Sequence, residues 1–293
     1  MMQRRKFIAL LGGTVTWPLA THAQQRDASA IYLYQGADRQ QRLVEMAKQE
    51  ATLSFYTSMA TTESQPLADA FEREYGIKAR IWRASNDQLM QRIVTEARGG
   101  RHVFDVVETN SHDLEALGQQ ENLVSEFYSP YVANLRKGAV PSHRKWAGDR
   151  FNLFTVTYNT KKVRREDIPP TYEGFLDPKW KGRLAVEAAN EEWFGAVIRY
   201  WGEQRGMDFF RKLSAMKPEG RKGHIVVAQL IAAGEIDVGL TVYSSNADSI
   251  RKKGGSVEWR AVEPLVVRSQ GVAVARNAPH PAAALLFADF LLS

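Results

Sequence analysis

The stretch LSFYTSMATTESQPLADAFEREYG, residues 53–76, decides the class of the fold. Its first part, Leu53 to Tyr56, is apolar and aromatic, which is typical of a buried strand. After a polar link, apolar residues recur at helical spacing until Gly76, a residue type that often ends helices: Leu67, Ala70, Phe71 and Tyr75. The stretch therefore predicts a strand followed directly by one helix.

The same order of elements repeats twice along the chain. A strand is predicted over residues 77–81, and the helix after it ends at Gly99 and Gly100. A third strand over residues 104–107 precedes a third helix over residues 111–117. Strands separated by single helices predict a parallel sheet with right-handed crossovers.

A second α/β unit follows a strand predicted over residues 151–159. Its strands are predicted at residues 184–187, 236–242 and 257–262, and its helices at 193–201, 207–216, 225–233 and 247–253. A strand over residues 271–275 and a helix from Pro281 then return to the first unit. We therefore predict an α/β fold with two lobes. The first lobe is made of residues 27–158 plus 263–293, and the second of residues 159–262. Two crossings, near residues 159 and 262, would place a ligand cleft between lobes that can close about a hinge.

The N-terminus has the pattern of a cleavable export signal. A basic start is followed by a mainly apolar run over residues 7–17 and by the small-x-small site Thr21-His22-Ala23. The pair Arg4-Arg5 before Lys6 and Phe7 resembles a twin-arginine signal, and an ordinary Sec signal is the alternative. We expect cleavage near Ala23 and a periplasmic location.

Charge and cysteine content exclude several classes of partner and site. The chain carries a formal charge of +6, of which the signal supplies three charges, so the pattern does not predict nucleic-acid binding. It has no cysteine, which rules out disulfides and thiolate metal sites. No motif predicts a cofactor, and we expect a monomer.

Four phrases in order resemble one known family. They are FYTSMATTESQPLADAFEREYGIKARIW, DPKWKGRLAVEAANEEWFGAVI, QLIAAGEIDVGL and APHPAAALLFADFLLS. The resemblance is to the extracellular solute-binding proteins of ABC importers, in the type II group usually labelled ferric-iron-binding. It implies a type II periplasmic-binding-protein fold, a small-molecule solute held between the lobes, and an ABC permease in the inner membrane as the partner.

The chain departs from that family at the iron site. Ferric-binding members hold iron with adjacent tyrosines, where this sequence has Ser244 and Ser245, and Tyr243 lies one residue away. Ala60 stands near the expected histidine, and Asn110 near the expected glutamate. Ferric iron prefers anionic oxygen donors, so we predict no metal site. Direct ferric binding is the alternative to an anionic or hydroxylated solute or a ferric chelate.

The C-terminal end is a second departure from the family. Residues 285–293 read as an apolar helix without a stop signal, whereas relatives continue with further helices. The resemblance therefore implies a C-terminus truncated relative to the family.

Candidate ligand-binding residues lie at predicted strand ends and helix starts. They are Tyr56, Ser58, Met59, Asn110, Tyr158, Glu192, Trp193, His224, Tyr243 and Ser244. Arg83 or His224 would supply the charge that balances an anion. Each has a structural alternative: the aromatic residues can pack between the lobes, and the polar ones can cap helices or face water.

The sequence leaves two other classes of function open. A binding protein that signals to a membrane sensor would have the same sequence features, and gene neighbours would separate it from an import subunit. An enzyme would need a reactive constellation, yet no H-E-x-x-H, G-x-S-x-G or phosphate-loop pattern occurs. Glu191 and Glu192 are adjacent, so on a helix they cannot flank one bond as a catalytic pair. We predict that the protein is not an enzyme.

Overall fold

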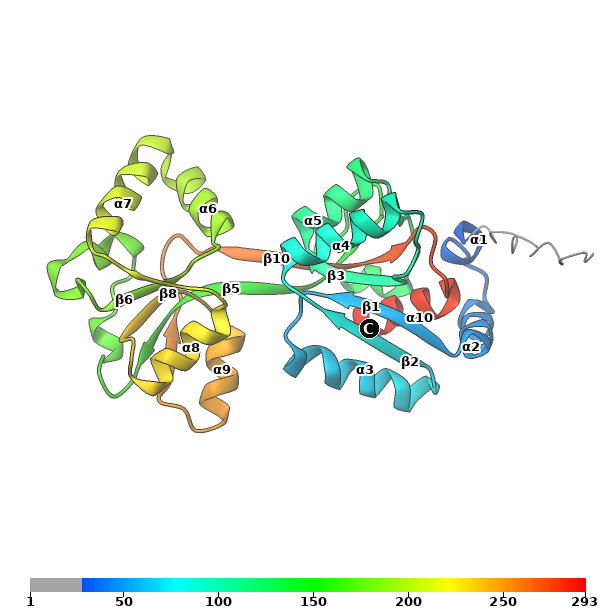
Figure 1. Ribbon diagram of the computed structural model, residues 1–293, viewed down its shortest axis with the longest axis horizontal. Coiled ribbons are helices and arrows are strands. Elements are labelled where there is room, and N and C mark those ends of the chain that lie inside the picture. The colour runs from blue at the N-terminus through cyan, green and yellow to red at the C-terminus, as the bar shows by residue number, and fades with distance from the viewer. Residues whose placement is uncertain (1–27) are drawn as a thin grey trace, which may run out of the picture.

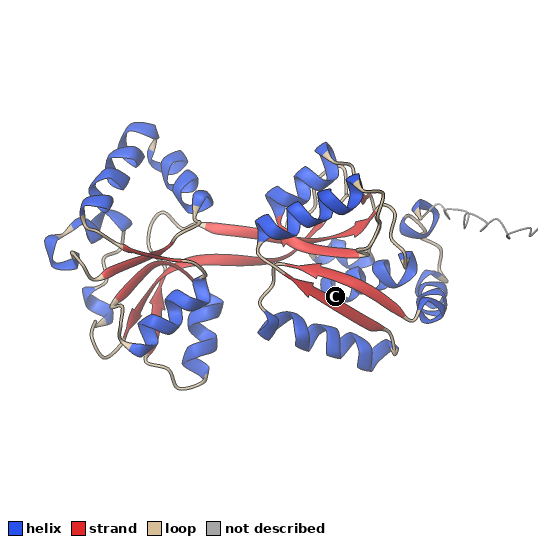
Figure 2. Cartoon of the chain, viewed as in Figure 1, coloured by secondary structure: helices blue, strands red, loops and turns tan. Residues whose placement is uncertain are grey.

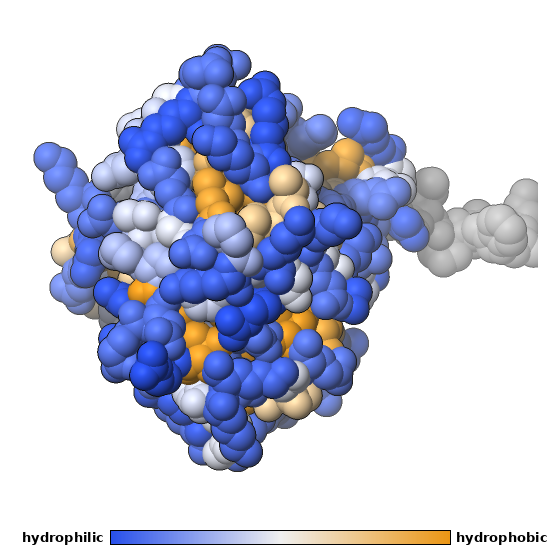
Figure 3. Space-filling view, turned by 90° about the vertical axis from the view of Figure 1, so that its left-hand side faces the viewer, coloured by the Kyte–Doolittle hydropathy of each residue, from blue (hydrophilic) through white to orange (hydrophobic). Residues whose placement is uncertain are grey.

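A computed structural model describes residues 28–293, which form two α/β lobes connected by two long strands (Figure 1). The predicted export signal, residues 1–23, lies outside the described residues. Within residues 28–293, no helix is long and apolar enough to cross a membrane. The surface at the free end of the second lobe is mainly hydrophilic, with narrow apolar strips between charged groups (Figure 3).

The first lobe is built on the predicted parallel sheet. Its strands are β1 (Thr52–Thr57), β2 (Lys78–Arg83) and β3 (Val106–Asn110), and β1 pairs in parallel with both others. The helices that follow these strands are α3 (Thr61–Tyr75), α4 (Asn86–Arg98) and α5 (Ser111–Glu115), the last continued by a π-helical turn over Ala116–Gln120. The strand and helix pattern predicted for residues 53–117 is therefore confirmed.

The second lobe has the predicted α/β character with one additional strand. Its sheet contains β6 (Leu184–Glu187), β7 (Glu219–Arg221), β8 (Val238–Tyr243) and β9 (Val257–Arg260). Its helices are α6 (Glu191–Trp201), α7 (Glu203–Ala215), α8 (His224–Ala233) and α9 (Ser244–Lys252). Strand β7 is polar and lies at the sheet edge, so it carries no apolar pattern by which the sequence could reveal it.

The strands β5 (Ala147–Asn159) and β10 (Val267–Ala275) join the lobes (Figure 1). The first half of β5 pairs with β10, and its second half pairs with β8 and β9 of the second lobe. Phe154 already pairs with Tyr243, so the chain enters the second lobe earlier than residue 159. We therefore propose lobe boundaries near residues 154 and 267 in place of 159 and 262.

In each lobe, helices lie on both faces of the strands (Figure 2). The core of the first lobe surrounds the C-terminal helix α10 (Pro281–Leu292), which is almost entirely buried. The Phe287 ring lies 4.8 Å from the Phe55 ring and 4.9 Å from the Phe71 ring. Further elements complete this lobe: α1 (Ser29–Tyr32), α2 (Arg39–Glu50) and β4 (Val124–Ser125). The Asp289 carboxylate accepts a hydrogen bond from Arg39 at 2.6 Å, which fixes α10 to α2.

The strand directions bring the functional ends of both sheets together. Strand β3 runs antiparallel to β10, and its last residue, Asn110, pairs with Gln270. Strand β8 runs antiparallel to β5, and its last residue, Tyr243, pairs with Phe154. These two pairing partners, Gln270 and Phe154, lie where β10 and β5 pass between the lobes. The carboxyl ends of the parallel strands, and the N-termini of the helices that follow them, therefore lie at the junction of the lobes.

Candidate functional site

The paired part of β5 and β10 between the lobes, here called the hinge ribbon, has two chemically different faces. Asn152 pairs with Arg268 and Arg150 with Gln270, so these four side chains share one face of the antiparallel pair. Phe151 and Val267 alternate with them and are exposed on the other face. The ribbon therefore presents two arginines and two amides on a single polar face.

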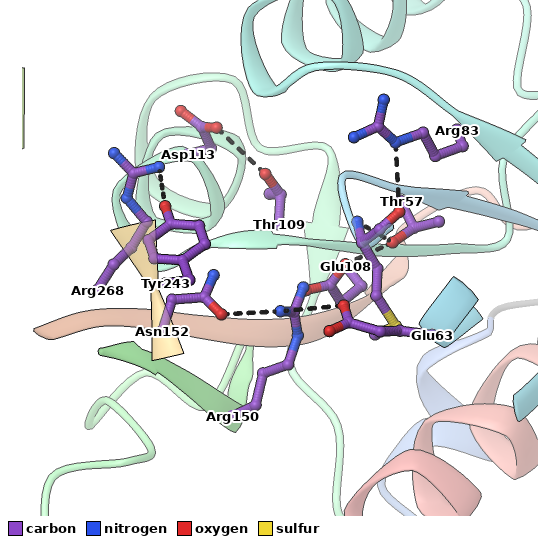
Figure 4. Close-up of polar contacts among 11 residues, drawn as sticks. Thr57, Glu63, Arg83, Glu108, Thr109, Asp113, Arg150, Asn152, Tyr243 and Arg268 are labelled. Atoms are coloured by element: carbon purple, nitrogen blue, oxygen red, sulfur yellow. Dashed lines mark hydrogen bonds and ion pairs between the residues drawn. The ribbon is translucent and has the colours of Figure 1, made fainter. Parts of the chain in front are cut away.

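Arg150 attaches the hinge ribbon to the first lobe. Its Nη2 donates to Oε1 of Glu108 at 2.7 Å, and its Nη1 donates to Oδ1 of Asn152 at 3.1 Å (Figure 4). Glu108 is fully buried and also accepts a hydrogen bond from the Thr57 hydroxyl. The Thr57 oxygen accepts in turn from the backbone N–H of Met59 at 2.9 Å. These contacts fix the ends of β1 and β3 relative to the ribbon.

Arg268 attaches the ribbon to the second lobe. Its Nη1 lies 2.7 Å from the Tyr243 hydroxyl, to which it donates, and its Nε donates to the Glu192 carboxylate at the start of α6. The guanidinium carbon lies 5.5 Å from the centre of the Phe154 ring and 5.9 Å from that of Tyr243. Two aromatic rings and two polar partners therefore hold Arg268 in one position.

His224 supports Tyr243 as a neutral imidazole. The two rings are stacked with their centres 3.7 Å apart, and Nδ1 of His224 lies 2.7 Å from the Thr241 carbonyl oxygen. Burial lowers the pKa of His224 to about 3, so at neutral pH Nδ1–H donates to Thr241 and Nε2 is an acceptor. Burial also raises the pKa of Tyr243, which keeps its hydroxyl protonated.

The first lobe contributes the loop after β1 and the ends of β2 and β3. Ser58 is half-buried there, while Met59 is buried and its carbonyl accepts from Nε of Arg83 at 3.3 Å. Asn110 caps α5, since its Oδ1 accepts from the Asp113 backbone N–H at 2.8 Å. Asp113 also accepts from the Asn110 amide. It accepts in addition from the Thr109 hydroxyl (Figure 4). The capping alternative for Asn110 is therefore observed in the structure.

Three predicted site residues are packed inside the lobes instead of lining the junction. Tyr56 is buried and its hydroxyl donates to Glu96 at 3.1 Å, within a cluster that includes Trp82. Tyr158 and Trp193 are buried in the core of the second lobe. These three aromatic side chains pack within the cores of the lobes, and their contact with a ligand stays a prediction.

Ser244, the first residue of α9, is half-buried next to Tyr243, as expected for a residue at the junction.

Two residues of the site, Arg150 and Arg268, are not predicted from the sequence pattern. Arg150 and Arg268 precede the strands predicted from residues 151 and 271, so both strands were predicted too short. The alternation of polar and apolar residues over positions 150–153 is the signal by which Arg150 could be found, whereas residues 265–271 show no such alternation.

Within the part of the chain that the structure describes, no three His, Asp or Glu side chains form a group that could hold a metal ion. The site offers instead the guanidinium groups of Arg150 and Arg268, the Tyr243 hydroxyl and the backbone N–H groups of helix N-termini. Such donors suit anionic oxygen atoms.

Two α/β lobes joined by two strands define the class of the fold, which is that of the type II periplasmic binding proteins. The profile of the bacterial extracellular solute-binding proteins matches residues 56–293, and the chain belongs to this family.

Individual relatives bind different solutes. The major ferric iron-binding protein of Neisseria meningitidis serogroup B is 26% identical over 257 residues, which cover 83% of this chain and 76% of the relative. Iron-bound HitA from Pseudomonas aeruginosa superimposes with a TM-score of 0.74 and 24% identity, over 83% of this chain and 81% of HitA. AfuA from Actinobacillus pleuropneumoniae, with fructose-6-phosphate bound, superimposes with a TM-score of 0.72 and 21% sequence identity, over 83% of this chain and 79% of AfuA.

Proposed function

We propose that this protein is the periplasmic solute-binding subunit of an ABC importer, which captures a small anionic solute between its lobes and delivers it to a permease in the inner membrane. The observation that carries the proposal is the position of Arg150 and Arg268. Both lie on the polar face of the hinge ribbon, and each contacts a different lobe. An anion bound there touches the two strands about which the lobes turn.

The chemistry of the junction favours carboxylate or phosphate groups, carried by an organic acid, a phosphate ester or a ferric chelate. Arginine matches these groups because its fork of N–H donors fits two oxygen atoms at once. Arg83 adds a third guanidinium at the end of β2, as the counter-charge that the sequence suggests. The fructose-6-phosphate bound to AfuA shows that the same fold can hold an anionic solute in another protein.

Direct ferric binding is the second candidate, and the names of the iron-binding relatives favour it. Against it stand Ser244 and Ser245, which offer neutral hydroxyls where phenolates are expected. Tyr243 already accepts from Arg268, and its raised pKa disfavours the phenolate form. We therefore place direct ferric binding second, after an anionic solute or a ferric chelate.

Family members are binding proteins, and we propose that this chain has no catalytic activity and acts as a monomer. Two carboxylates at the junction, those of Glu108 and Glu192, are each engaged by an arginine, which disfavours a catalytic role for these two groups. Neither is free to act as a base while it holds this contact.

A thermal-shift panel on the mature protein tests the proposed function. It covers organic acids, sugar phosphates, phosphonates, neutral sugars, amino acids, and ferric salts with and without citrate. A solute that binds the native state raises the melting temperature by mass action, by several degrees at a hundredfold excess over Kd. We expect the shifts among anionic solutes. A well-folded sample that responds to no class argues against a solute receptor, and a coloured complex with ferric salt alone establishes direct iron binding.

A further inference from the structure

The contact between Arg268 and Glu192 has a consequence for solute binding in addition to its role in stability. Arg268 is the better buried partner: its side chain is 13% exposed, against 38% for Glu192. The guanidinium is held by the Phe154 and Tyr243 rings and by the Tyr243 hydroxyl, whereas Glu192 reaches it from the first turn of α6. The arginine is therefore the fixed partner, and the carboxylate is the one that can turn away into water.

We propose that the Glu192 carboxylate and the anionic group of the solute compete for the same guanidinium, that of Arg268. This inference rests on the proposed function, and it assigns the anion subsite to Arg268 together with the Tyr243 hydroxyl. Glu192 acts as an internal substitute for the solute anion.

The exchange is chemically balanced. A half-buried guanidinium without an anionic partner destabilises the protein. Both the Glu192 carboxylate and the anionic group of the solute can accept hydrogen bonds from the same N–H groups of Arg268. When the solute takes the place of Glu192, one ion pair replaces another, and the released glutamate regains hydration at an already exposed position.

The position of Glu192 at the lobe junction supports the competition. Burial raises the pKa of Asp113 in the first lobe, and among the smaller causes is the negative charge of Glu192 in the second lobe. Glu192 also contacts Arg268 on β10, the strand that continues into the first lobe and pairs there with β3, so it lies at the junction. A solute that displaces it from Arg268 enters the region between the two lobes.

Calorimetric titration of three proteins with two defined probes, citrate and inorganic phosphate, tests the proposal. The proteins are the wild type, Glu192→Gln, and the matched control Glu191→Gln, which removes the same charge from an exposed neighbour on the same helix turn. We expect Glu192→Gln to bind at least one probe about tenfold more tightly than the wild type, while Glu191→Gln stays within about twofold. Equal melting temperatures of the two variants confirm that the comparison concerns binding and not folding.

Three results overturn the competition. Unchanged or weaker binding in Glu192→Gln shows that the carboxylate does not compete. An equal gain in affinity in both variants shows that the effect comes from the loss of one negative charge near the site, at either position. If neither probe binds any of the three proteins while the thermal-shift panel finds a neutral solute, the anion subsite is wrong and the solute-receptor function stands. A panel without any response rejects the receptor function itself.

Discussion

The paired rings of His224 and Tyr243 show how burial sets the chemistry of single residues at the junction. The two side chains stack on each other, and burial keeps the imidazole unprotonated and the phenol protonated. Both are therefore neutral groups for hydrogen bonding, and Arg268 supplies the positive charge beside them.

The lowered pKa of His224 predicts a specific loss of stability in acid. The folded-state pKa of about 3 lies below the usual value near 6.5, so the unfolded chain takes up the proton first. The contribution of His224 is fully present above pH 6.5 and is lost as the pH falls toward 3, by up to about 1.4 kcal/mol per pH unit. Urea unfolding of His224→Gln should show a flatter dependence between pH 6 and 4 than the wild type.

The matched control for this prediction is His102→Gln, at an exposed position in the first lobe. It should keep the wild-type dependence on pH. A His224→Gln variant with the wild-type slope would show that another group is responsible for the acid sensitivity.

At this scale the sequence predicts polar strand ends well and charged strand residues poorly. Tyr243, Ser244, His224 and Glu192 lie at the junction because they follow apolar runs or begin helices. Arg150 and Arg268 are missed because a charged side chain in a strand usually faces water, and only the pairing of β5 with β10 shows which face it occupies. Tyr56 and Trp193 are buried in the cores of the lobes, because an aromatic residue beside a strand or helix end packs inward as readily as outward.

The hinge ribbon is the element on which the function depends, and Gly271 is its tightest point. A bulge separates Gln270 from Gly271, and a Cβ atom added to Gly271 would lie 2.6 Å from the Ala147 carbonyl oxygen. Gly271→Ala should therefore destabilise the protein by about 1–3 kcal/mol in urea unfolding, because the backbone of β5 must move.

Gly195→Ala serves as the control, since Gly195 lies inside α6 and the nearest atom to an added Cβ is the end of the flexible Arg199 side chain, at 3.4 Å. It should gain about 0.5–1 kcal/mol from helix propensity. A Gly271→Ala variant as stable as the wild type would show that the two hinge strands can separate without cost.

Elements with strong periodicity follow from the sequence, and those with polar composition do not. The helices α3 and α4 are found because apolar residues recur on one face. The strand β7 is missed because it is short, polar and little buried. Its pairing with β6 determines this strand, and a local pattern does not contain such a contact. The helix α2, in contrast, buries Leu43 and Ala47 at helical spacing, so its sequence contains a pattern from which it can be predicted.

The whole molecule is two lobes that share a pair of strands, so an event at the ribbon concerns both lobes at once. The alternation of strands and helices predicts the lobes, and the strand over residues 271–275 predicts the return of the chain. The residues at which the chain crosses between the lobes follow only from the pairing of the strands. Strand β5 is continuous through both sheets, and it changes partners without a break in its sequence pattern.

Small-angle scattering of the wild type and of Arg268→Gln, with and without a saturating anionic solute from the panel, tests whether the solute is captured between the lobes. We predict that the solute reduces the radius of gyration of the wild type, because binding between the lobes draws them together about β5 and β10. Arg268→Gln, folded as judged by its melting temperature, should show no reduction at the same concentration. A solute that binds without any change in the radius of gyration, and equally well to Arg268→Gln, would contradict capture of the solute between the lobes.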